Sequence, residues 1–202
     1  MPTFAQIQDR INLDYLNRSD LVNETKRSIL SAIRYYEKKR WWFNETATAL
    51  TTSAGQTYVT FPTNFLILDD LQITLNSADY SLSRRNIDFI REANTTRTQG
   101  QPTDFAIYQN RIELFPIPGS AYSLPIHYIK SLTALSADTD TNAWLSVAED
   151  CIVYRATMLM LLGAMGTPEK ALPFAQLEAQ SYKQLVSENE QRMNLRLHPT
   201  TF

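Results

Sequence analysis

The hydrophobic pattern of this 202-residue chain changes its period twice, and that change constrains the fold more than any other feature. Apolar residues recur at helical spacing up to about residue 42, alternate with polar residues from Glu45, and return to helical spacing from Trp144. The first change falls within "YYEKKRWWFNETATAL", which contains neither glycine nor proline. This order predicts helices, a β-rich middle and helices again, which is an α+β arrangement.

Two helices are expected before the first change of period. Thr3 can cap the first helix, and Gln6 stands three residues later, as in a capping box. Ser19 or Asp20 can cap the second helix, which should run to about residue 40 or 42. The apolar stripe of this second helix comprises Val22, Ile29, Ile33 and Tyr36.

The middle of the chain has the pattern of short strands joined by turns. "ETATALTTSAGQTYVTFP" predicts a hairpin with its loop at 53–56, and "FAIYQNRIELFPIPG" predicts another with its turn at 109–110. "FLILDDLQITL" and "AYSLPIHYIKSL" predict two further strands, and Pro125 favours an edge position or a bulge in the second of these. "LSRRNIDFIREAN" predicts a short helix. We therefore expect an antiparallel β region inserted between the flanking helices.

Two further helices are expected after the polar linker "SADTDTNAW". The first, from Trp144 to Gly163 or Gly166, is apolar almost all round and should be the most buried helix. The second follows the break at "GTPEK". The prediction is a four-helix assembly of two N-terminal and two C-terminal helices. Its helical domain comprises 1–43 and 143–195, its inserted β-rich domain 44–142, and its extended C-terminal tail 196–202.

The sequence offers no recognisable set of residues for catalysis, for a metal or for a cofactor. Cys151 is the single cysteine, so an intramolecular disulfide is impossible, and its apolar surroundings predict a buried small hydrophobe. Two widely separated histidines, His127 and His198, cannot complete a structural zinc site with one cysteine. No glycine-rich phosphate loop or G-x-S-x-G motif occurs. We expect no enzyme, no metal and no cofactor.

Charge and hydropathy exclude other classes of protein. The net charge of −2 gives no general argument for nucleic-acid binding, so any contact with DNA must be local. The longest apolar run, 158–165, is far shorter than the roughly 20 residues that a membrane span needs. The N-terminus lacks the pattern of a secretion signal. These features predict a soluble protein made inside a cell, with no membrane contact.

One basic cluster lies next to a pair of tryptophans at the end of the second helix. It contains four cations: Arg34, Lys38, Lys39 and Arg40. They form either a solvated helix end, where the helix dipole favours cations, or a patch that faces an anion or a neighbouring subunit. Adjacent tryptophans point in different directions, so we expect Trp42, with Phe43, to close the helical core. Trp41 would then face a neighbour or solvent.

The residues around this cluster resemble the head-to-tail connector (adaptor) proteins of short-tailed bacteriophages. Those proteins have a helix that ends in an Arg/Trp/Phe-rich segment, then a threonine-rich strand and a "G-Q-x-x-Y-x-x-P-x-x-F" hairpin. The segment from 32 to 73 has the same order, with the motif residues at Gly55, Gln56, Tyr58, Pro62 and Phe65, although only one residue separates Gln56 from Tyr58 and Pro62 comes one residue late after Tyr58. The paired C-terminal helices are similar too, with a Gly-x-Pro-Glu type break. Residues 77–103 match no known pattern.

The resemblance implies a protein of the virion neck, made in the host cytoplasm. It implies a dodecameric ring beneath the portal protein that extends the DNA channel, passes DNA without sequence-specific binding, and carries the tail nozzle or tail fibres. A C-terminal segment would dock on the portal, with candidate residues Leu195, Leu197, His198 and Phe202. Subunit or DNA-channel contacts would come from Arg34, Lys38, Lys39, Arg40 and Trp41. A stopper or tail-completion protein of the neck is the alternative, and a small intracellular hydrolase is a remote one.

Overall fold

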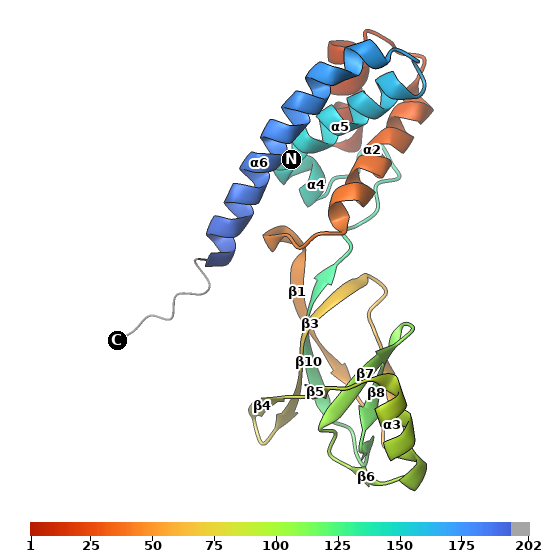
Figure 1. Cartoon of the computed structure of the whole chain (residues 1–202), viewed down its shortest axis with the longest axis vertical. Coiled ribbons are helices and arrows are strands. Elements are labelled where there is room, and N and C mark those ends of the chain that lie inside the picture. The colour runs from red at the N-terminus through yellow and green to blue at the C-terminus, as the bar shows by residue number, and fades with distance from the viewer. Residues whose placement is uncertain (195–202) are drawn as a thin grey trace, which may run out of the picture. The chain divides into compact units, whose positions relative to one another are not determined.

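The computed structural model describes residues 1–194 and confirms the α+β class, with helices at both ends of the chain and β-sheets between them (Figure 1). The chain divides into two compact units. The helical unit contains Met1–Phe43 and the chain from Leu132 onward, and the β unit contains Asn44–Ser131. Two separate hydrophobic cores match this division, one in each unit.

The N-terminal part of the helical unit has α1 (Phe4–Asp9), a π-helical turn η1 (Arg10–Tyr15) and α2 (Val22–Glu37). The capping box is confirmed: the Thr3 side chain accepts from the Gln6 N–H, and the Gln6 side chain accepts from the Thr3 N–H. Helix α2 ends earlier than the sequence pattern predicts, at Glu37, and Lys38 caps it. The basic cluster therefore straddles the helix end rather than lying inside the helix.

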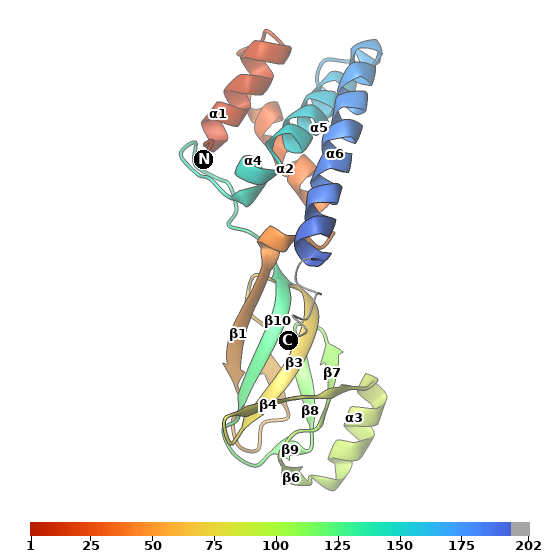
Figure 2. The ribbon, with the colours of Figure 1, turned by 90° about the vertical axis from the view of Figure 1, so that its left-hand side faces the viewer.

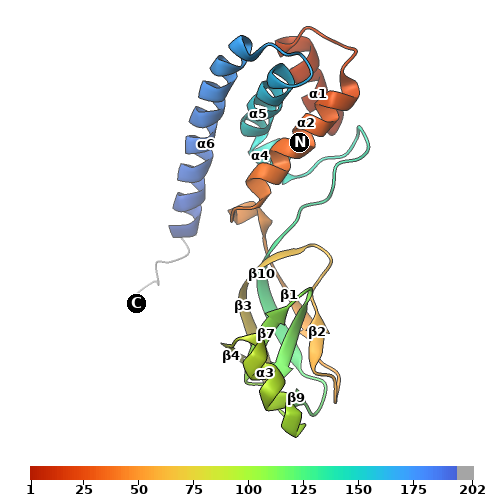
Figure 3. The same cartoon turned by 45° about the vertical axis from the view of Figure 1, so that its right-hand side comes forward.

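The C-terminal part has α4 (Ala143–Val147), α5 (Glu149–Leu162), a 3₁₀ turn η4 (Pro168–Lys170) and the long helix α6 (Ala171–Asn194). The apolar segment expected as one helix is therefore two helices, because the backbone leaves the helical region at Ala148. Helix α5 packs against both α2 and α6 (Figures 1 and 3). Half of the residues of α5 are buried, and only Asp150 and Leu162 are exposed.

The polar linker after the β unit groups with the helices, whereas the sequence prediction placed residues 132–142 in the β-rich domain. The difference comes from backbone hydrogen bonds. The N–H of Phe4 donates to the Asp140 carbonyl at 2.8 Å, and the N–H of Ala5 donates to the Asp138 carbonyl at 2.9 Å. The first N–H groups of a helix have no partner within the helix, and here the linker supplies one for each of these two.

The first sheet of the β unit is fully antiparallel. It contains β1 (Glu45–Thr51), β10 (Ser123–Lys130), β3 (Phe65–Leu75) and β4 (Ala78–Ser81), in the order β1-β10-β3-β4 (Figure 2). Pro125 lies in a central strand, and the register with β3 shifts two residues later, between His127 and Tyr128. Edge strands β1 and β4 are largely exposed.

The second sheet contains β2 (Tyr58–Thr60), β8 (Arg111–Phe115), β7 (Asp104–Tyr108) and β5 (Ser83–Arg84), in the order β2-β8-β7-β5. The predicted hairpin at 109–110 is confirmed as β7–β8, and α3 (Ile87–Ala93) is the expected short helix. The 3₁₀ turns η2 (Trp42–Asn44) and η3 (Asn94–Thr96) and the strand pair β6 (Gln99–Gly100) and β9 (Ile117–Pro118) complete the chain. Two short strand pairs, β5–β7 and β6–β9, are parallel.

The predicted hairpin at 53–56 is wrong. Strands β1 and β2 lie in different sheets, where β1 pairs with β10 and β2 pairs with β8. The turn between them, with Gly55 at a φ of +77°, carries the chain from one sheet to the other. The hydrogen-bonded partner of each of these strands therefore lies far along the chain. The two sheets enclose one core of inward-facing apolar residues.

Candidate functional site

The segment that leaves α2 is anchored in the helical core by the first tryptophan of the pair. Trp41 is only 1% exposed, and its Nε1–H donates to the Tyr36 carbonyl at 3.0 Å. Its ring lies parallel to Phe43 and edge-on to Trp144. Helix α2 ends before this point, so the chain turns and the Trp41 indole reaches the Tyr36 carbonyl at the helix end, which also accepts from the Lys39 N–H at 3.0 Å.

The two tryptophans therefore have the reverse of their predicted roles. Trp42 is half-buried and packs edge-on against Phe43, with ring centroids 5.1 Å apart, whereas Trp41 closes the core. The prediction that Trp41 faces a neighbouring subunit is wrong for this reason. Sequence spacing could not decide between them, since the exact end of α2 sets which of the two turns inward.

The four cations of the basic cluster are all exposed, but they differ in the contacts that they make. The Lys39 ammonium donates to the Tyr182 hydroxyl of α6 and lies 4.6 Å from the centre of that ring. This hydrogen bond raises the pKa of Lys39 above its usual value. Arg34 and Lys38 are exposed and have no carboxylate partner among the described residues. Arg40 accepts a hydrogen bond at its backbone carbonyl from Asn189, at 3.3 Å.

The C-terminal half of α6 holds the segment between α2 and β1. The Trp42 N–H donates to Asn189 Oδ1 at 3.0 Å, and the Arg192 guanidinium lies 4.6 Å from the centre of a Trp42 ring. Arg192 also pairs with Glu188 one turn earlier, at 2.7 Å. No sequence motif indicates this attachment. Asn189 and Arg192 lie in a polar helical run with no motif, so only the three-dimensional packing identifies them.

A buried polar network joins α2, α5 and α6. The Tyr36 hydroxyl donates to the Glu178 carboxylate, and Arg155 Nη1 donates to the same carboxylate oxygen at 3.3 Å. Tyr36 is fully buried, and Tyr35 beside it stacks under Arg155 at 3.4 Å. Burial, followed by the hydrogen bond to Glu178, raises the pKa of Tyr36 far above its usual range. The network fixes the three helices together.

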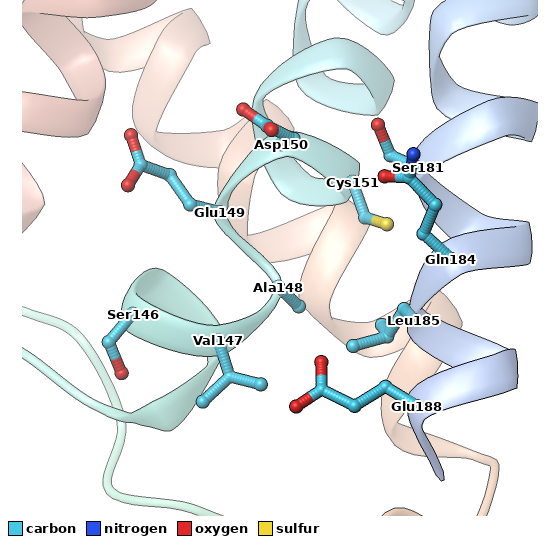
Figure 4. A pocket seen from close by; sticks show the side chains of 10 residues that line it. All are labelled: Ser146, Val147, Ala148, Glu149, Asp150, Cys151, Ser181, Gln184, Leu185 and Glu188. Carbon is cyan, nitrogen blue, oxygen red and sulfur yellow. The ribbon is translucent and has the colours of Figure 1, made fainter. Parts of the chain in front are cut away.

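A pocket of about 300 Å³ lies between the start of α5 and the middle of α6 (Figure 4). Figure 4 shows the side chains of Glu149 and Cys151 pointing to opposite sides of α5. Arg10 pairs with Glu149 at 2.5 Å and with Asp150 at 2.7 Å, so both carboxylates are compensated. Burial, and next the negative charge of Glu178, raise the pKa of Cys151 to about 12, so the thiol stays protonated near neutral pH. This pocket lacks an activated nucleophile.

The remaining predictions concern a metal, the membrane and the C-terminal tail. Among residues 1–194, no group of three or more His, Cys, Asp or Glu side chains is placed to hold a metal ion. No helix in this part of the chain is both long and apolar enough to cross a membrane. The candidate portal-docking residues lie outside the described residues: Leu195, Leu197, His198 and Phe202.

Comparison with known protein families gives one match. The family model described as "SU10 adaptor protein" covers residues 2–199, which is nearly the whole chain. The chain belongs to the SU10 adaptor protein family. This family consists of structural phage adaptor proteins and is not an enzyme family, so the resemblance drawn from the sequence is confirmed. No curated protein sequence matches the chain.

Proposed function

We propose that this protein is the head-to-tail adaptor of a phage virion neck. Copies of the chain form a dodecameric ring beneath the portal, extend the DNA channel and carry the tail nozzle or tail fibres. The observation that supports the proposal is the family match over residues 2–199, which covers both the helical and the β unit. The protein acts by assembly and passes DNA without reading its sequence.

A closed ring requires two different surfaces on each subunit, because one copy contacts its neighbours through a heterologous interface. The basic cluster is one candidate for such a surface or for the DNA channel. Within this cluster we take Arg34 and Lys38 as the candidates, because Lys39 binds Tyr182 and Trp41 is buried. The tail residues Leu195, Leu197, His198 and Phe202 are the candidates for portal docking, in a protein made in the host cytoplasm and incorporated into the neck.

Mass measurement tests the proposal directly. We expect the isolated chain to be a monomer by light scattering and to form a ring of defined mass when mixed with the portal protein. A chain that stays monomeric and never binds a portal ring contradicts the proposal. Crosslinking within assembled particles separates the adaptor from the stopper or tail-completion alternative, because only the adaptor contacts the portal directly.

A further inference from the structure

One face of α2 carries cations and small polar residues along its whole length. Positions 23, 27, 31, 34 and 38 are spaced by three or four residues, so they lie on one face of a helix. All five are exposed: Asn23, Arg27, Ser31, Arg34 and Lys38. We call Arg27, Arg34 and Lys38 the α2 basic stripe. From Arg27 to Lys38 it extends about 16 Å along the helix.

The stripe is positive because its cations lack carboxylate partners. Most other cations of the helical unit are paired with a carboxylate, namely Arg10, Arg18, Lys26, Arg155 and Arg192. Within residues 1–194, no carboxylate pairs with Arg27, Arg34 or Lys38. The whole chain has a net charge of −2, so the positive charge of the stripe is a local feature.

The residues between the cations favour a polyanion over another protein as the partner. The centre of a stable protein–protein interface is usually apolar and depleted of charged residues. The stripe has short polar side chains, Asn23 and Ser31, between its cations. Tyr35, an aromatic residue exposed on the same helix, has the Arg155 guanidinium 3.4 Å from its ring centre. Phosphate groups on a nucleic-acid backbone repeat regularly and pair with cations whatever the sequence.

We propose that the α2 basic stripe binds the phosphate backbone of double-stranded DNA. The inference rests on the proposed function, because a ring would place many copies of a weak contact around one duplex. Lys39 and Trp41 take no part, since each is held against the helical unit. Three phosphate contacts per chain correspond to a slope of about −2.7 in a plot of log binding constant against log salt concentration.

Anisotropy measurements with a labelled 30-base-pair duplex of random sequence test the stripe. The full-length chain is titrated at several salt concentrations, starting at low salt. Removal of Arg34 and Lys38 together, by Arg34→Ala and Lys38→Ala, should make the salt slope shallower by about 2 and weaken binding about tenfold. The matched control removes two exposed cations elsewhere on the helical unit, by Lys170→Ala and Lys183→Ala, and should change affinity less than twofold.

The assembly of each variant with the portal is measured on the same samples. We expect the stripe variant to form rings of wild-type mass. Lost assembly with unchanged DNA binding would make the stripe a protein contact and overturn the inference, while the adaptor function stands. Equal weakening by both pairs of substitutions, or no DNA binding by the wild-type chain at low salt, would also overturn it. Wild-type DNA binding without any assembly would instead overturn the adaptor function alone.

Discussion

Replacement of Trp41 by alanine tests the packing of the segment between α2 and β1. The side chain is 1% exposed, and large-to-alanine substitutions of buried aromatic residues cost about 3–5 kcal/mol. Part of this cost is the lost hydrogen bond from Nε1 to the Tyr36 carbonyl, which contributes about 0.5–1.5 kcal/mol. Because each kcal/mol shifts Tm by about 2–4 °C in a chain of this size, Trp41→Ala should lower Tm by at least about 6 °C.

Trp42→Ala is the matched control, because it removes the same side chain one position along. Trp42 is half-buried at the edge of the helical core and contacts Phe43 and the guanidinium of Arg192, so we expect a smaller cost of about 1–2 kcal/mol. Urea unfolding followed by circular dichroism at 222 nm measures both variants without relying on tryptophan fluorescence. A Trp42→Ala cost equal to or above that of Trp41→Ala would refute the assignment of Trp41 to the core.

Three further predictions concern buried ionisable groups and the basic cluster. The raised pKa of Tyr36 means that the unfolded chain loses its proton first, so this contribution to stability is present below about pH 10 and lost as pH rises above it. In urea unfolding between pH 9 and 11, Tyr36→Phe should therefore lose less stability than wild type, and an equal loss would contradict this. Cys151 should resist a thiol reagent at pH 8 in the native protein and react within minutes in urea, whereas fast native labelling would contradict its burial. Replacement of Arg34 and Lys38 by Glu should impair DNA binding more than monomer melting, because neither side chain is held against the rest of the helical unit. A change in Tm alone would make the cluster structural.

The order of helices and strands could be predicted from the sequence because it depends on local hydrophobic periodicity. The local pairing of the β7–β8 hairpin could be predicted as well, but long-range pairing could not, since β1 and β2 are neighbours in sequence and still belong to different sheets. That outcome depends on which long-range partner completes each ladder, and β10 comes about 70 residues later. The reversed roles of Trp41 and Trp42 have a similar cause. A shift of one residue in the end of α2 rotates the following side chains by about 100°.

The starting point of a C-terminal deletion decides what the deletion measures. Asn189 and Arg192 hold the backbone and ring of Trp42, so a deletion that enters α6 would loosen the helical unit and lower Tm. A deletion of 197–202 leaves both contacts in place, and we expect the stability of the chain to change by less than about 0.5 kcal/mol. Its affinity for the portal, measured by surface plasmon resonance on immobilised portal rings, should fall at least tenfold if the tail docks there. Asn189→Ala is the complementary control, because it should lower Tm while the tail residues remain present. Unchanged portal affinity after deletion of 197–202 would refute tail docking without touching the fold.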